Sequence, residues 1–194
     1  MPNPYIPRID VHAWSEAIGN NQADHEPALT RLLKQQRRLT RFLEENRESL
    51  APASAGIAVY LYGVLARIYD LAGGQLRTAT WAQVRDAERR VGAEVANLLP
   101  LDDGFAERVR EVAWRVQPHV LDEALMALFD REDPEEGEAN LDDGESAKVF
   151  LLMWVANEVL DANWRPGTGF AGETTYTYVH IEEEEKEAAD QPDG

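Results

Sequence analysis

Apolar residues recur along this chain mostly at the spacing of an α-helix. The most apolar stretch covers residues 54–72, where only Arg67 and Asp70 are charged. A helix that is apolar on nearly every side is either a membrane span or the central helix of a soluble bundle. This stretch is barely long enough to cross a bilayer, and its two charges lie in its last turns. We therefore interpret it as a central helix.

A second stretch, Lys148–Trp164, is also apolar on most sides and predicts a partner for the first. Residues 130–145 between the helical regions have the composition of a solvated loop. The chain is therefore predicted to be all-α, a single helical bundle of about six to eight helices with two central apolar helices and an acidic C-terminal tail. The bundle is expected to cover residues 1–166, and a Gly/Thr-rich segment with the tail to cover residues 167–194.

Capping residues and prolines set the other predicted elements. Three prolines among the first seven residues favour an extended arm. Thr80 is a helix cap, Gly73-Gly74 is a helix end, and Pro118 is a helix start. Residues 174–181 alternate polar and β-prone side chains, which indicates one isolated strand. We expect an arm over residues 1–13, a short helix over 14–18, and longer helices over 24–50, 80–99, 105–117 and 118–129.

Two glycines share one face of the 54–72 helix. Gly56, Tyr60, Gly63 and Arg67 lie together on the helical wheel. Each glycine destabilises a helix by roughly 1 kcal/mol relative to alanine, so a close approach is expected there. The face is either a tight helix–helix crossing or the floor of a groove for a ligand or partner, with Arg67 as its anion contact.

A basic stripe follows the 24–50 helix opposite its leucines. It consists of Arg31, Lys34, Arg38 and Arg41. Such a stripe is either a solvated face or a docking surface for an acidic group, and the acidic part of this same chain is the nearest candidate. These four residues and Arg67 are the predicted partner-binding residues.

Glu88 is the odd charge in the apolar stripe of the 80–99 helix. A carboxylate rarely enters a core without a partner. Either the edge of the stripe reaches solvent at this position, or Glu88 meets a cation such as Arg67.

The net charge of −17 is concentrated in the last third of the 194 residues. Residues 131–194 carry 18 acidic and 4 basic side chains, net −14, which leaves −3 for the rest. Such a chain repels phosphate backbones, so nucleic acid is not an expected partner. The sequence has no cysteine and begins without a recognisable secretory signal, so a cytoplasmic location is expected.

No motif predicts catalysis or a cofactor. Residues 167–172 match the letters G-x-G-x-x-G, but they follow a helix and open none, so a nucleotide site is not expected. The four histidines show no E-x-x-H or H-x-x-x-H spacing, and there is no G-x-S-x-G. We therefore predict no catalytic residue, metal site or cofactor.

These observations favour a non-enzymatic protein-interaction module, with an inhibitor or immunity-type protein as the more specific version. It would bind a protein partner or form a homo-oligomer, without nucleic acid or membrane. The alternative is a small hydrolase or a metal-dependent helical-bundle enzyme that uses scattered acidic and histidine side chains. A buried cluster of two or more candidates would favour the enzyme, and dispersed, exposed candidates would favour the module. The candidates are His12, His25, His119, Glu158 and Asp161.

Overall fold

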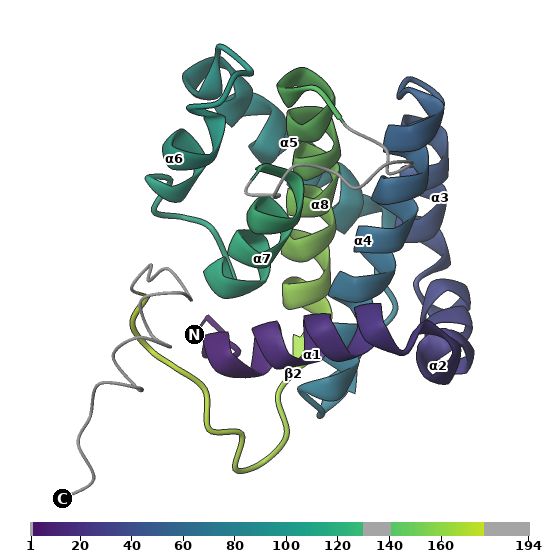
Figure 1. Cartoon of the computed structure of the whole chain (residues 1–194). Helices are drawn as coiled ribbons and strands as arrows, with labels where there is room; N and C mark the ends of the chain where they lie inside the picture. The colour runs from purple at the N-terminus through teal and green to yellow at the C-terminus, as the bar shows by residue number, and fades with distance from the viewer. Residues whose placement is uncertain (1, 130–140, 177–194) are drawn as a thin grey trace, which may run out of the picture.

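The computed structural model describes residues 2–129 and 141–176. Within these ranges the chain forms eight helices and almost no sheet (Figure 1), which confirms the predicted all-α bundle. The predicted acidic tail lies outside the described residues. The helices are α1 Arg8–Asn20, α2 Gln22–Gln35, α3 Arg37–Arg47, α4 Pro52–Leu71, α5 Trp81–Leu98, α6 Phe105–Arg110, α7 Pro118–Phe129 and α8 Asp143–Asn163.

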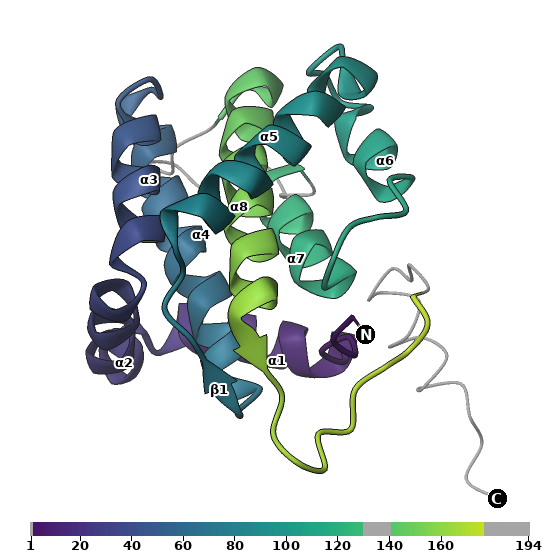
Figure 2. The same cartoon turned by 180° about the vertical axis from the view of Figure 1, so that it is seen from behind.

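Helices α4 and α8 form the centre of the bundle, as predicted. Helix α8 packs against α4, α5 and α7 (Figures 1 and 2), and residues 153–160 are all buried. Leu151 and Leu152 of α8 are only half-buried, whereas Met153 is fully buried. In the described part of the chain, no helix is long and apolar enough to cross a membrane.

The N-terminal arm is shorter than predicted. Helix α1 begins at Arg8, directly after Pro7, and runs through the region predicted as arm and short helix. Pro7 precedes the helix with φ −56°, an angle that the proline ring already fixes and that suits a helix start. Only residues before Pro7 remain as an arm.

The single helix predicted over residues 24–50 is wrong. Helix α2 ends at Gln35 and α3 begins at Arg37, because Gln36 leaves the helical conformation with ψ 35°. The buried Gln36 side chain donates to the Arg77 carbonyl oxygen at 2.8 Å and accepts from the Ala79 amide at 3.0 Å. Both polar ends of the amide are thus satisfied inside the protein, which fixes the segment that leads into α5.

The predicted helix starts and ends are confirmed where they depend on neighbouring residues alone. Thr80 caps α5 and forms a capping box with Gln83, and Pro118 begins α7. Gly73 and Gly74 follow α4 with positive φ angles. A Cβ on Gly74 would overlap the Arg165 carbonyl oxygen, so this position requires glycine.

The helix predicted over residues 105–117 is too long. Helix α6 ends at Arg110, and the connection to α7 includes Gln117, a buried residue with φ 43°. A positive φ at a side chain of this size is uncommon and persists where surrounding contacts hold it. This connection lies beside the arm and α8, and it brings several polar side chains together.

The sheet consists of two very short strands, β1 Gln75–Leu76 and β2 Trp164–Arg165, paired antiparallel. The strand predicted over residues 174–181 is not formed at 174–176, and its remainder lies outside the described residues. Glu173 instead forms an isolated bridge with Tyr5, with amide-to-carbonyl distances of 2.8 and 2.9 Å. The domain boundary after residue 166 stays a prediction.

Candidate functional site

A groove of about 520 Å³ lies between α1, α2 and α4. Its walls are mainly apolar, with Gln22 and Glu26 as polar groups on α2 and Tyr60, 42% exposed, on α4. Pockets of this size and character are typical of ligand sites. The main apolar contributors are Ile18, Leu29, Leu33, Val59 and Val64.

The helical period explains why these residues face one another. Gln22, Glu26, Leu29 and Leu33 follow each other by three or four positions, so they share one face of α2. Across from them, a Cβ on Gly63 would lie 3.4 Å from Leu29 Cδ2. Gly63 thus lies at a close crossing of α2 and α4, and it also lines the groove. Both interpretations of the glycine face therefore apply to this residue. Gly56 has open space around its Cα and does not take part in that crossing.

Arg67 lies one turn beyond Gly63, and its partners are His25 on α2 and Asp70 on its own helix. Its Nε donates to His25 Nδ1 at 3.2 Å, and its Nη1 contacts the Asp70 carboxylate. The hypothesis that Arg67 pairs with Glu88 is wrong, because Glu88 is exposed on α5. The edge of the α5 stripe reaches solvent there, which was the other expectation for Glu88.

The basic stripe is divided between two helices by the break at Gln36. Arg31 Nη2 lies 2.8 Å from both carboxylate oxygens of Asp70, Arg38 donates to the Ala79 carbonyl oxygen at 3.1 Å, and Arg41 lies 2.8 Å from Glu45. Lys34 is exposed. Three of the four cations thus have partners within the chain, and their role in binding an acidic partner stays a prediction.

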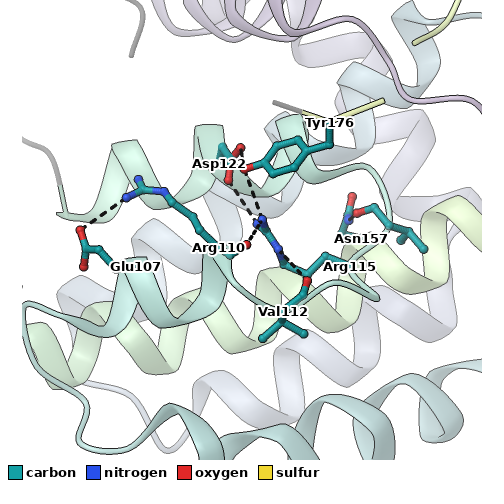
Figure 3. A network of polar contacts seen from close by, with 8 residues as sticks. Glu107, Arg110, Val112, Arg115, Asp122, Asn157 and Tyr176 are labelled. Carbon is teal, nitrogen blue, oxygen red and sulfur yellow. Dashed lines mark hydrogen bonds and ion pairs between the residues drawn. The ribbon is translucent and has the colours of Figure 1, made fainter. Parts of the chain in front are cut away.

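A second region of interest is a buried ion pair beside the α6–α7 connection (Figure 3). Arg115 Nη1 lies 3.2 Å from Asp122 Oδ1, and the two side chains are only 2% and 1% exposed. Arg115 Nη2 donates to the Arg110 carbonyl oxygen at 3.0 Å. The Tyr176 hydroxyl donates to Asp122 Oδ2 at 2.7 Å. Burial, followed by the negative charge of Asp122, raises the pKa of Tyr176 to about 12, so the phenol stays a donor.

His119 joins the same region from the first turn of α7. Its Nε2 lies 2.7 Å from Glu173 Oε2, and its ring packs near those of Tyr5 and Tyr176. The histidine side chain is 3% exposed, whereas that of Glu173 is 42% exposed. Together with the Asp122 contacts, this pair attaches the segment 173–176 to α7.

The carboxylates Glu158 and Asp161 lie on the neighbouring face of α8. Burial raises the pKa of each carboxyl group, which disfavours the ionised form. Glu158 Oε2 is held by Arg90 Nη2 at 2.9 Å. Asp161 accepts from Gln117 Nε2 at 2.8 Å and from Asn3 Nδ2 at 3.2 Å.

The five candidate side chains do not all support the same alternative, enzyme or interaction module. His119 and Glu158 are buried and Asp161 is half-buried, but His119 pairs with Glu173, whereas the two carboxylates bind other groups. His12 and His25 are half-buried elsewhere, near Glu123 and Arg67. Within residues 2–129 and 141–176, no group of three histidine and carboxylate side chains is placed to hold a metal ion.

Sequence reasoning missed Asp122, Gln117 and Tyr176. One signal was available for Asp122, because Leu125, Met126 and Phe129 place it on an apolar side of α7, where a carboxylate predicts a buried cation nearby. Tyr176 and Gln117 gave no such signal, since their partners are distant in sequence. No protein-family model, curated protein or solved structure matches this chain, so its function has to be inferred from its own residues.

Proposed function

We propose that this chain is a non-enzymatic, cytoplasmic protein-interaction module of the inhibitor or immunity type. It takes one face of a basic amphipathic helix from a partner protein into the groove between α1, α2 and α4, and it does not bind nucleic acid. The observation that carries the proposal is the mainly apolar groove of about 520 Å³, which lies open beside two crossing helices.

A helix is the occupant that suits the walls of this groove. Amphipathic helices present apolar side chains at intervals of three and four residues, and they bind grooves through a few such anchors. The α2 wall carries its own residues at the same intervals, from Gln22 to Leu33. Tyr60 adds an exposed aromatic ring beside the groove, and aromatic residues are common at the energetic centres of interfaces.

The charges favour a basic partner. Among the described residues that line the groove, Glu26 is the ionised one. Exposed acidic residues stand close by in the sequence, Asp24 on α2 and Glu16 on α1, and Arg31 and Arg67 both contact Asp70. The net charge of −17 would also attract a basic protein at long range and speed its association.

A labelled model peptide tests the proposal. The peptide has one leucine face flanked by lysines, and the control peptide has the same composition in scrambled order. Fluorescence anisotropy should show saturable binding of the first peptide alone. Ala23→Trp, which fills the groove, should weaken binding by about tenfold or more, equivalent to about 1.4 kcal/mol. Ala82→Trp, on an exposed position of α5, should leave it unchanged.

Charge reversal separates the groove from general acidity. Glu26→Lys should weaken binding, whereas Glu44→Lys on α3 changes the net charge equally and should have little effect. Equal binding of the two peptides, or equal effects of the paired variants, would refute the proposal. A concentration-dependent dimer that Ala23→Trp abolishes would instead assign the groove to a second copy of the chain.

The enzyme alternative keeps one supporting observation, the neighbouring carboxylates Glu158, which is buried, and Asp161, which is half-buried. Carboxyl groups with raised pKa beside a cleft are frequent at catalytic sites. A panel of ester, amide and phosphoester substrates tests it. Turnover that is lost in both Glu158→Gln and Asp161→Asn, but kept in the exposed control Glu88→Gln, would replace the interaction proposal with a hydrolase.

A further inference from the structure

A separate cleft of about 350 Å³ lies between α5 and α8, on residues that the proposed groove does not use. Helix α5 contributes polar side chains, including Asp86, Arg89 and Arg90, and α8 contributes Glu158 and small apolar groups. The volume lies within the range of small-molecule sites.

The inner end of this cleft is a buried carboxylate. The Glu158 side chain is 1% exposed, and its Oε2 lies 2.9 Å from Arg90 Nη2. Its Oε1 accepts a long hydrogen bond, 3.4 Å, from the Val116 amide. An ionised carboxylate can accept about four hydrogen bonds, so Arg90, the Val116 amide and the neighbouring Trp154 side chain leave capacity for one more donor. Burial raises the pKa of Glu158, and a further cation would offset that desolvation.

The outer end of the cleft carries arginines. The side chains of Arg90 and Arg89 are 54% and 76% exposed. Arg90 also stands over the Trp114 ring, 5.7 Å from its centroid. Arg89 is held by Asp86 at 2.6 Å, but both groups are exposed, and exposed ion pairs contribute little. Arg89 can therefore exchange Asp86 for another anion at low cost.

The cleft thus has Glu158, paired with Arg90, at its buried end and the exposed pair Arg89 and Asp86 at its outer end. Ala87, Val159 and Ala162 supply small apolar surface between them, which suits a methylene chain. A ligand that matches this order carries a cation at its inner end, an aliphatic stem, and a carboxylate at its outer end.

We infer that the α5–α8 cleft binds a small cationic amino acid, with its guanidinium or side-chain ammonium on Glu158 and its α-carboxylate on Arg89 and Arg90. In the absence of this ligand, the guanidinium of Arg90 partly occupies the same carboxylate. The inference stands on its own and does not depend on what binds the groove.

Calorimetric titration of the full chain with L-arginine tests the inference. L-citrulline has nearly the same shape but a neutral urea in place of the guanidinium, and agmatine lacks the carboxylate. We expect saturable binding of L-arginine, with L-citrulline weaker by at least about tenfold and agmatine weaker by a smaller factor. Equal binding of L-arginine and L-citrulline, or no L-arginine binding at millimolar concentration, would overturn the inference.

Variants locate the two ends of the ligand. Glu158→Gln should abolish L-arginine binding, whereas Glu88→Gln, an equal charge change on the exposed face of α5, should preserve it. Arg89→Gln changes only an exposed side chain, so its effect is readable even if Glu158→Gln fails to fold. It should reduce the preference for L-arginine over agmatine without abolishing it, because Arg90 remains. A preference for L-arginine that is unchanged in Arg89→Gln would overturn the assigned orientation.

Discussion

At the scale of single residues, Asp122 connects three parts of the chain that are distant in sequence or separated by a loop. One of its oxygens meets Arg115 from the α6–α7 connection, and the other accepts from Tyr176 near the end of the described chain. A carboxylate this deeply buried is tolerated because both oxygens are satisfied. Replacing Asp122 should therefore lower the stability of the folded protein by more than the loss of two ordinary hydrogen bonds would.

Asp122→Ala is expected to lower the free energy of unfolding by about 3–5 kcal/mol, because Arg115 is left as a buried charge without its partner. Tyr176→Phe removes one hydroxyl and should destabilise by about 1–3 kcal/mol. Urea denaturation of both variants measures the difference. A loss below about 0.5 kcal/mol for Asp122→Ala would mean that solvent reaches Arg115 in the native protein.

Leu61 and Leu152 belong to the two central helices but differ in burial. Leu61→Ala should cost about 2–5 kcal/mol, because Leu61 is 5% exposed, and Leu152→Ala should cost less. Urea denaturation of the two variants compares them directly. Equal losses would show that Leu152 is packed as tightly as Leu61. The sequence predicted both helices as central, but a helix that is apolar on nearly all sides has no obvious outer face.

At the scale of elements, helix ends that depend on neighbouring residues could be predicted from the sequence. Ends that depend on contacts between distant residues could not. Thr80, Pro118 and Gly73-Gly74 act through neighbouring backbone atoms, so their roles could be predicted. Gln36 breaks the predicted 24–50 helix because its side chain bonds residues 77–79, which lie about forty positions away. No local pattern contains that information.

Helix α8 begins with an acidic turn whose contribution to stability depends on pH. Asp142 caps the helix, while Glu145 binds Lys148 Nζ at 2.7 Å and the Ala51 amide at 3.1 Å. Lys148 foremost, with the Ala51 amide also contributing, lowers the pKa of Glu145 from 4.5 to about 2. A lowered carboxyl pKa stabilises the folded state above the ordinary pKa, and this contribution is lost as pH falls toward the folded value.

Glu145→Gln should therefore be less stable than the natural chain at pH 6, and the difference should shrink between pH 4.5 and pH 2. Urea denaturation at pH 6, 4 and 3 measures it. A difference that stays constant over this range would show that Glu145 acts through its shape and not its charge.

At the scale of the whole molecule, the fold could be predicted better than the sites. The two central helices and the all-α class followed from apolar periodicity along the chain. The groove depends on how α2 crosses α4 at Gly63, and the buried pair depends on Arg115 meeting Asp122 across a helix start. Glu158 and Asp161 were named as candidates from the sequence, but their surroundings depend on α5 and the N-terminal arm, which contact them.

Buried carboxylates oppose the effect of Glu145 on the pH dependence of the whole protein. Burial raises the pKa of Asp161, so its protonated form favours folding below the ordinary pKa, and this contribution is lost as pH rises through the folded pKa. Asp161→Asn should therefore become more stable relative to the natural chain as pH rises from 4 to 7. Thermal denaturation across this range tests the sign. The opposite trend would mean that the donors Gln117 and Asn3 outweigh desolvation.

The bridge between Tyr5 and Glu173 joins two segments of the same chain, so their docking is an intramolecular association. Once the bundle has formed, it holds the two segments near each other at a high effective concentration, so a few weak contacts suffice to keep them docked. The same arrangement makes this docking the smallest cooperative unit that can open. Native-state hydrogen exchange should release the Tyr5 and Glu173 amides together, and well before those of α4 and α8.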